Sequence, residues 1–159
     1  MIKTEGIILK EADLNEIDRL LTVYTKELGK VNVSAKGVKK LESKLRYSIE
    51  PVSYVQLILV KGKNFLILKD SVLIDEFIKT KKDLKKIKLA REIAEIIDEA
   101  IIGEEKDEEI WELISTTYKV IDAGRDFARA GYINQDFQKN LIKLLGYDPE
   151  KIKDLKDIY

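Results

Sequence analysis

The chain has 159 residues, carries 29 Lys and Arg against 29 Asp and Glu, and contains neither histidine nor cysteine. Without cysteine it can form no disulfide, thiolate nucleophile or iron–sulfur cluster, and a zinc ion would find only carboxylate ligands. Acid–base catalysis would need a carboxylate, lysine or tyrosine with a shifted pKa. No apolar run approaches the roughly 20 residues that cross a bilayer, and no basic-then-apolar leader opens the chain. We therefore expect a cytoplasmic protein without a membrane segment, metal site or cofactor.

The zero net charge hides two halves of opposite sign. Residues 1–80 carry 14 basic and 11 acidic side chains, whereas residues 81–159 carry 15 and 18. Residues 26–46 include seven basic and two acidic side chains, and residues 92–112 include ten acidic side chains and one lysine. A local basic cluster attracts polyanions whatever the total charge. The first window is thus a candidate nucleic-acid site, and a solvated, lysine-rich loop is the alternative.

The first half of the chain predicts strands. Residues 30–36, KVNVSAK, alternate between apolar and polar side chains, which is typical of a strand with one buried and one solvated face. The other predicted strands are rich in β-branched, aliphatic or aromatic residues and are separated by turn signals. The five segments are residues 7–9, 19–26, 30–36, 52–60 and 65–72. Five short strands at this spacing favour a small closed barrel or a sandwich.

The second half predicts helices, because apolar residues recur at every third or fourth position. The segments are residues 84–101, 108–123 and 127–145, with a short helix over 150–158. The period changes from 2 to 3.6 near residues 78–82, so we place one domain at residues 1–79 and another at 80–159. An all-β part followed by an all-α part predicts an α+β protein, with a β barrel followed by a helical bundle.

Basic side chains continue from the polar face of residues 30–36 into the following loop. Lysines spaced in this way could follow a phosphate backbone and give affinity without reading sequence. Nearby aromatic side chains could stack on the bases of single strands. The predicted DNA-binding residues are Lys30, Lys36, Lys39, Lys40, Lys44, Arg46, Tyr24 and Tyr47. Core packing is the alternative for the two tyrosines, and it is the favoured interpretation for Tyr54 and Phe65.

A second basic group lies on or beside the last long helical segment. Lys139 and Lys143 are four residues apart, so they share a helical face beside the apolar stripe. An apolar groove rimmed by cations would suit a peptide that ends in acidic and aromatic residues; ordinary helix solvation is the alternative. The predicted partner-binding residues are Arg125, Arg129, Lys139 and Lys143.

The acidic window, residues 92–112, could bind a metal only through carboxylates, and a solvated helix face is the favoured interpretation. Phosphate-loop, dinucleotide-binding and nucleophile-elbow patterns are absent from the sequence. We therefore predict no catalytic residues and a protein that is not an enzyme.

Several segments form a recognisable pattern when they are taken in order. They are KTEGIILK (3–10), EIDRLLTVYTKELGK (16–30), AKGVKK (35–40), Ser43, EPVS (50–53) and LLGYDP (144–149). The ordered set, which spans nearly the whole chain, resembles the bacterial RecO family of recombination mediators. The last segment is similar to that family's LLGY-x-P sequence.

The resemblance implies an N-terminal five-stranded OB-fold barrel and a C-terminal helical domain. It implies binding of single- and double-stranded DNA, annealing of complementary strands, and loading of the RecA recombinase onto SSB-covered strands together with the partner RecR. It places the contact with the SSB C-terminal tail on the helical domain. The family's basic loop maps onto Lys36, Lys39, Lys40, Lys44 and Arg46. The alternative is a protein-interaction module whose barrel binds a partner protein rather than nucleic acid.

One feature departs from the family pattern. Many RecO proteins carry a four-cysteine zinc motif after the LLGY-x-P segment, followed by further helices. This sequence has no cysteine and ends ten residues after Pro149. We expect either a naturally short member or a chain whose C-terminal part is missing, with no zinc site in either case.

Overall fold

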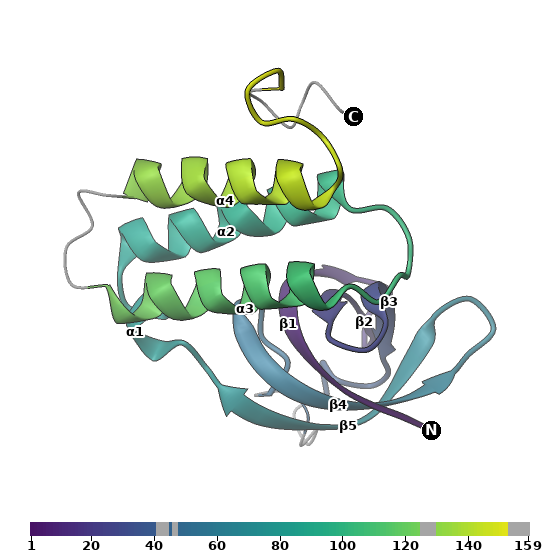
Figure 1. The fold of residues 1–159 in the computed structure, drawn as a ribbon. Coiled ribbons are helices and arrows are strands. Elements are labelled where there is room, and N and C mark those ends of the chain that lie inside the picture. The colour runs from purple at the N-terminus through teal and green to yellow at the C-terminus, as the bar shows by residue number, and fades with distance from the viewer. Residues whose placement is uncertain (41–44, 46–47, 125–129, 153–159) are drawn as a thin grey trace. The chain divides into compact units, whose positions relative to one another are not determined.

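The computed structural model describes residues 1–40, 45, 48–124 and 130–152 (Figure 1). The chain forms two compact units. The first comprises Met1–Glu76 and the short segment Gly103–Lys106, and the second comprises Phe77–Ile102 and Asp107–Tyr159. The sequence pattern predicts two separately folding domains, residues 1–79 and 80–159. Whether each part folds on its own, with a boundary at residue 79, stays a prediction.

The first unit is a closed five-stranded barrel. Neighbouring strands are antiparallel except for β3 and β5, which run parallel through the pairs Val33–Leu66 and Ser34–Ile67. The strands close in the order β1-β2-β3-β5-β4. They are β1 (Ile2–Asp13), β2 (Arg19–Thr25), β3 (Gly29–Ala35), β4 (Ser53–Lys61) and β5 (Leu66–Asp75). This arrangement confirms the expected OB-type barrel.

Side-chain alternation accounts for the interior of the barrel. In β4 every second residue from Ser53 to Leu59 is buried, and the residues between them are half-buried. Apolar side chains from all five strands meet inside, joined by Val38 and Ile49 from the segment between β3 and β4. Each fully buried aliphatic side chain contributes about 1.5–3 kcal/mol relative to exposure. The apolar pattern thus decides which face turns inward and leaves the polar face available for binding.

The first strand is longer than the sequence pattern indicated. Only residues 7–9 were predicted to be extended, but β1 covers Ile2–Asp13. The strand pairs with β4 from Ile2 to Ile8 and with β2 from Gly6 to Asp13, with a bulge between Ile8 and Lys10. Neighbouring strands supply these backbone hydrogen bonds, so the polar ends of β1 remain extended without an apolar pattern of their own.

The second unit contains helices, as predicted. They are α1 (Ile78–Lys81), α2 (Leu84–Ala100), α3 (Glu108–Ala123) and α4 (Ala130–Leu144). Four residues are too few to show a helical period, which is why α1 was not predicted. The expected start of the last long helix at residue 127 lies outside the described residues, as does most of the expected helix over 150–158. None of the helices in the described ranges is both long and apolar enough to span a membrane.

The two longer helices α2 and α3 begin at aspartate caps. The Asp83 carboxylate accepts hydrogen bonds from the Lys85 and Lys86 amides, and the Asp107 carboxylate accepts one from the Ile110 amide. These caps satisfy amide groups that have no partner inside the helix.

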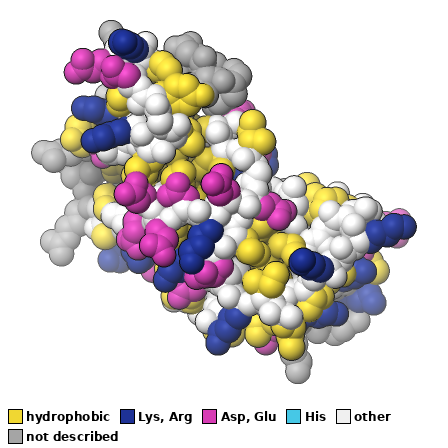
Figure 2. Space-filling view, turned by 45° about the vertical axis from the view of Figure 1, so that its right-hand side comes forward, with side chains coloured by type: hydrophobic (Ala, Val, Ile, Leu, Met, Phe, Trp, Pro, Cys, Tyr) yellow, Lys and Arg dark blue, Asp and Glu magenta, His cyan; other side chains and the backbone are white. Residues whose placement is uncertain are grey.

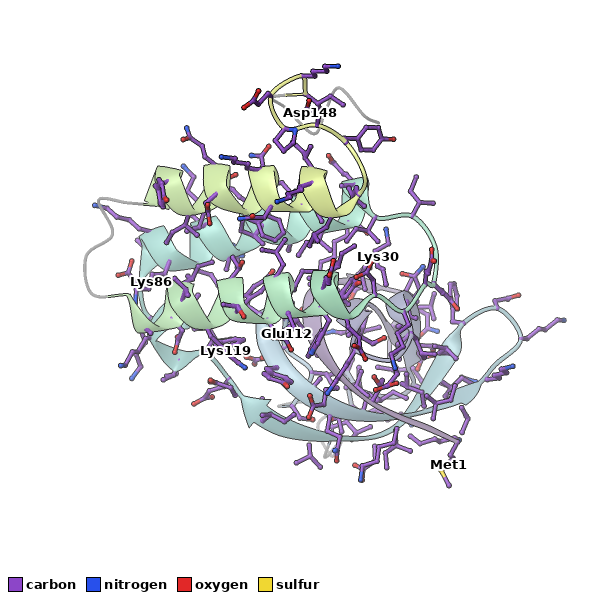
Figure 3. The ribbon with its side chains drawn as sticks, viewed as in Figure 1. Met1, Lys30, Lys86, Glu112, Lys119 and Asp148 are labelled. Atoms are coloured by element: carbon purple, nitrogen blue, oxygen red, sulfur yellow. The ribbon has the colours of Figure 1, made fainter. Side chains whose placement is uncertain are left out.

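A buried polar cluster joins three helices of the second unit. One carboxylate oxygen of Asp122 accepts hydrogen bonds from the Thr80 amide at 2.8 Å and the Thr80 hydroxyl at 2.9 Å. The Lys86 ammonium, labelled on α2 in Figure 3, donates to the backbone carbonyl of Asp122 at 2.8 Å. Lys86 is only 6% exposed and Thr80 only 1%. Because buried polar groups are costly without partners, this cluster requires each of its members.

Asp122→Ala is expected to lower the free energy of unfolding by about 1–3 kcal/mol, because it leaves the buried Thr80 amide and hydroxyl without their acceptor. The exposed Asp136 of α4 is the matched control, and its alanine variant is expected to stay within about 0.5 kcal/mol of the parent. Chemical denaturation followed by the fluorescence of the single tryptophan, Trp111, measures both. Equal effects of the two substitutions would contradict the role assigned to Asp122.

Candidate nucleic-acid interface

The basic turn, defined here as residues 36–40, directly follows β3. Gly37 adopts φ 66°, a left-handed conformation that glycine enters without steric cost. The Lys40 amide closes the turn by donating to the Gly37 carbonyl at 3.1 Å. Lys36 and Lys40 are both exposed. The turn therefore presents two lysines to solvent on either side of a fixed backbone bend.

The basic turn is fastened to the β1–β2 loop, residues 14–18. The Gly37 amide donates to one carboxylate oxygen of Asp18 at 2.6 Å, and the Asn15 side-chain amide donates to the other at 2.8 Å. The Lys39 amide donates to the Ile17 carbonyl at 3.0 Å. These bonds make the two loops one structural element.

Lys39 holds the two loops together with its side chain as well. Its ammonium group lies 3.1 Å from a carboxylate oxygen of Asp13 and 3.2 Å from the backbone carbonyl of Asn15. The ammonium is therefore engaged inside the protein, in contrast to the exposed Lys36 and Lys40. This surface pairing supports a positioning role for Lys39 in the turn, and its contact with phosphate stays a prediction.

Asp18 is the acidic centre of this element, and its pKa lies below the ordinary aspartate value. The hydrogen bond from Asn15 is the main cause, followed by the bond from the Gly37 amide, and nearby Lys36 and Lys40 add to the lowering; partial burial acts in the opposite direction. The two hydrogen bonds and the two lysines all stabilise the charged form of the Asp18 carboxylate. Asp18 thus remains ionised and keeps the turn anchored at neutral pH.

Asp18→Ala is expected to speed hydrogen exchange at the Gly37 amide several-fold, because the amide loses its acceptor. In the parent chain the anchoring should be fully present above the ordinary aspartate pKa of about 3.9. It should disappear only as pH falls through the lower value that Asp18 has in the folded state. Glu16→Ala, at an exposed position of the same loop, is the matched control. Unchanged exchange at Gly37 in Asp18→Ala would refute this anchor.

The outer face of β2 and β3 carries fewer charges than the turn. Lys30, labelled in Figure 3, is half-buried on β3 and stands opposite Tyr24 of β2 in the strand register. Further along, the Thr22 hydroxyl donates to the Asn32 side-chain oxygen at 3.4 Å, and Asn32 is exposed. This face offers small polar groups and one lysine.

Tyr24 is a predicted DNA-binding residue with core packing as the alternative, and its burial favours the alternative. Its side chain is 1% exposed. Leu21 and Val23 point into the barrel, so alternation turns Tyr24 outward, but its ring is nevertheless enclosed by protein. An enclosed ring is not available to stack on a base, so core packing accounts for Tyr24 in this structure.

Five other predicted residues lie outside the described part of the chain: Lys44, Arg46, Tyr47, Arg125 and Arg129. Lys139 and Lys143 are both exposed on α4. Lys143 lines a groove that α3 and α4 form, but the other charged side chains lining this groove are Glu108, Glu109 and Glu112. Acidic side chains therefore predominate near Lys143, and the cationic rim, to which Arg125 and Arg129 were assigned, stays a prediction.

Acidic side chains gather near the middle of the face shown in Figure 2. Glu92, Glu95 and Glu99 are all exposed on α2, as the interpretation of a solvated helix face requires. Among the residues the structure describes, no three Asp or Glu side chains come together in a way that could hold a metal ion.

Comparisons with known proteins connect this geometry to a family. Residues 1–77 match the family model described as recombination protein O N terminal. The chain is 32% identical over 148 residues to the DNA repair protein RecO of Roseiflexus sp. (strain RS-1), which covers 93% of this chain and 51% of the relative. The chain is thus similar to RecO proteins over nearly its whole length, and its N-terminal half matches the N-terminal model of the RecO family. This confirms the resemblance drawn from the ordered sequence segments.

Other RecO proteins give the same result. The protein of Thermoanaerobacter sp. (strain X514) is 29% identical over 94% of this chain and 60% of its own length. That of Clostridium perfringens (strain 13 / Type A) is 30% identical over 92% of this chain and 59% of its own length. The chain thus spans between half and three-fifths of the length of these RecO relatives.

The strand order of the barrel adds two candidate binding residues that the sequence pattern did not indicate. Lys61 and Lys63 are exposed on the β4–β5 hairpin, beside the half-buried Phe65. In OB-folds the β1–β2 and β4–β5 loops flank the oligonucleotide-binding face of the second and third strands. The KGKN sequence was interpreted only as a turn. Its lysines become candidates because of the strand order, which cannot be read from the sequence pattern.

Proposed function

We propose that the chain is a non-enzymatic DNA-binding mediator of recombinational repair that binds single- and double-stranded DNA. The observation that carries this proposal is the fixed basic turn, where Lys36 and Lys40 are exposed on a loop that Asp18 fastens to the β1–β2 hairpin. Lys61 and Lys63 on the second flanking loop and Lys30 on β3 extend the cationic surface. The RecO family match supports a role in DNA repair.

The binding mode follows from the side chains available. Lysines neutralise phosphates and fix the position of a strand without reading its bases. Among the described candidates only Phe65 offers a partly exposed ring near the basic loops, since Tyr24 is buried. Phosphate contacts therefore dominate over base stacking. A surface of this kind accepts any sequence and tolerates both strands of a duplex.

Strand annealing is the activity that such a surface supports best. Two complementary strands repel each other through their phosphates, and a protein that neutralises both lowers this barrier. We further propose that the chain helps to load RecA onto SSB-covered strands together with RecR, with the exposed Lys139 among the contacts to the SSB tail. In this proposal the chain acts in the cytoplasm and needs no cofactor.

An annealing assay tests the proposal. Two complementary labelled oligonucleotides are mixed with and without the protein at low salt, and duplex formation is followed over time. We expect the protein to accelerate duplex formation and the effect to fade as salt is raised. Tight oligonucleotide binding without faster annealing would restrict the proposal to DNA binding alone. Absence of oligonucleotide binding at low salt would contradict the whole proposal.

A further inference from the structure

One edge of the barrel exposes an apolar strand that no DNA contact would use. Val72, Leu73 and Ile74 of β5 are consecutive and are 57%, 38% and 46% exposed. Soluble proteins seldom leave such a run on a strand without a use, because apolar strand edges attract other chains. The function proposed above does not involve these residues.

The edge is open in the register of the sheet. β3 pairs with β5 only at Leu66 and Ile67, whereas β4 pairs with β5 as far as Asp75. In the described part of the structure, the second half of β5 therefore has a strand on one side only, and Figure 1 shows it at the border of the sheet. Backbone groups on the outer side of an edge strand are available to an added strand.

Two features limit the open stretch to the apolar residues. The Asp70 carboxylate accepts a hydrogen bond from the Ser71 amide at 2.9 Å, which occupies that backbone group. At the other end the register shifts at the Tyr54–Asp75 pair, so Ile74 is an extra residue on β5. The stretch from Val72 to Ile74 lies between these two points and can accept a short extended segment.

The charges around the stretch indicate what it accepts. Asp70, Asp75 and Glu76 are exposed at its two ends, and residues 70–76 contain no basic side chain. If a second copy paired antiparallel about Leu73, Asp70 of one copy would face Glu76 of the other. Like charges directly opposite each other in a sheet are destabilising. An added strand with basic residues at both ends would instead meet opposite charges.

We propose that the β5 edge, residues 72–74, is a strand-addition site for a partner protein that presents an extended apolar segment flanked by Lys or Arg. The partner strand gains backbone hydrogen bonds from β5, its apolar side chains cover Val72 and Ile74, and its basic ends meet Asp70 and Glu76. The site is separate from the basic turn, so a test of strand addition does not depend on whether the chain binds DNA.

A pair of synthetic peptides tests this site. Both contain the same alternating valine–threonine stretch, flanked by lysines in one and by glutamates in the other. Titrated into the ¹⁵N-labelled 159-residue chain, the lysine-flanked peptide is expected to shift the amide signals of residues 72–75. It is also expected to bind at least tenfold more tightly than the glutamate-flanked peptide. Saturating oligonucleotide should leave these shifts in place. The proposal is overturned if neither peptide binds, or if the two peptides bind equally tightly.

Two variants make the test specific. Ile74→Lys should abolish binding of the lysine-flanked peptide. The double variant Asp70→Lys with Glu76→Lys should reverse the preference toward the glutamate-flanked peptide, a result that a folding defect cannot imitate. If the parent protein self-associates in sedimentation experiments and Ile74→Lys prevents this, a second copy occupies the edge and the partner-strand proposal is wrong.

Discussion

Replacing Lys36, Lys40, Lys61 and Lys63 together by glutamate is expected to weaken oligonucleotide binding at low salt by at least about a hundredfold. Lys36 and Lys40 are exposed on the basic turn, which is bonded to the β1–β2 loop, and Lys61 and Lys63 are exposed on the β4–β5 hairpin. Each substitution removes a candidate partner for a phosphate and adds a repulsive charge. The log–log dependence of affinity on salt should flatten by about 0.7 for each phosphate of a single strand that is no longer neutralised.

A variant with the same change in net charge separates the site from a general charge effect. Lys79, Lys82, Lys85 and Lys139 are exposed lysines of the helical unit. Their joint replacement by glutamate is expected to reduce binding far less than the loop variant does. Fluorescence anisotropy with labelled oligonucleotides measures both proteins. If the two variants weaken binding equally, the barrel loops are not the binding site.

Gly29→Ala is expected to lower the free energy of unfolding by about 2–5 kcal/mol. Gly29 has φ 69°, where a residue with a Cβ is strained by about 1–2 kcal/mol. A Cβ at this position would also lie 2.3 Å from the backbone oxygen of Glu105, in the segment Gly103–Lys106 that packs against the β2–β3 turn. Relieving this overlap requires a backbone shift, which adds about 1–3 kcal/mol.

Gly37→Ala is the matched control for this prediction. Gly37 has nearly the same backbone angle, φ 66°, but a Cβ there would come no closer than 3.8 Å to the Lys40 side chain. This variant should therefore show only the destabilisation that comes from backbone strain. Chemical denaturation of both variants measures the difference. Equal destabilisation would show that the close approach of Glu105 to Gly29 does not contribute to stability.

An ion pair also joins the segment Gly103–Lys106 to the β2–β3 turn. The Lys106 ammonium lies 3.0 Å from a carboxylate oxygen of Glu27 on the same turn. Both side chains are about half exposed, so the pair is worth at most about 1 kcal/mol. The ion pair thus contributes little, and the close approach of the segment to the barrel requires a residue without a Cβ at position 29.

Much of the barrel could be predicted because its apolar pattern is local. Val31, Val33 and Ala35 alternate with polar residues and are all buried in the barrel core. The parallel pairing of β3 with β5 could not be predicted, since it joins Val33 to Leu66, two residues whose partnership leaves no periodic signal. The helix α1 was missed for a similar reason, because its four residues span a single turn.

The candidate site was predictable in its charges but not in its contacts. Lys36 and Lys40 are exposed where a basic loop after a strand was expected. The engagement of Lys39 by Asp13 depends on two loops meeting in space, which the sequence does not specify. Stacking and core packing both stayed open for Tyr24, because alternation assigns a side chain to the outer face of a strand and does not reveal whether that face is covered.

Salt dependence of oligonucleotide affinity tests the central claim most directly. Labelled single-stranded and duplex oligonucleotides are titrated with the unmodified protein between about 50 and 200 mM salt. The account predicts binding to both at the lower concentration, with affinity falling steeply and a log–log slope that corresponds to several phosphate contacts. Affinity that is independent of salt, or no binding at the lower concentration, would contradict it and leave the barrel as a protein-interaction module.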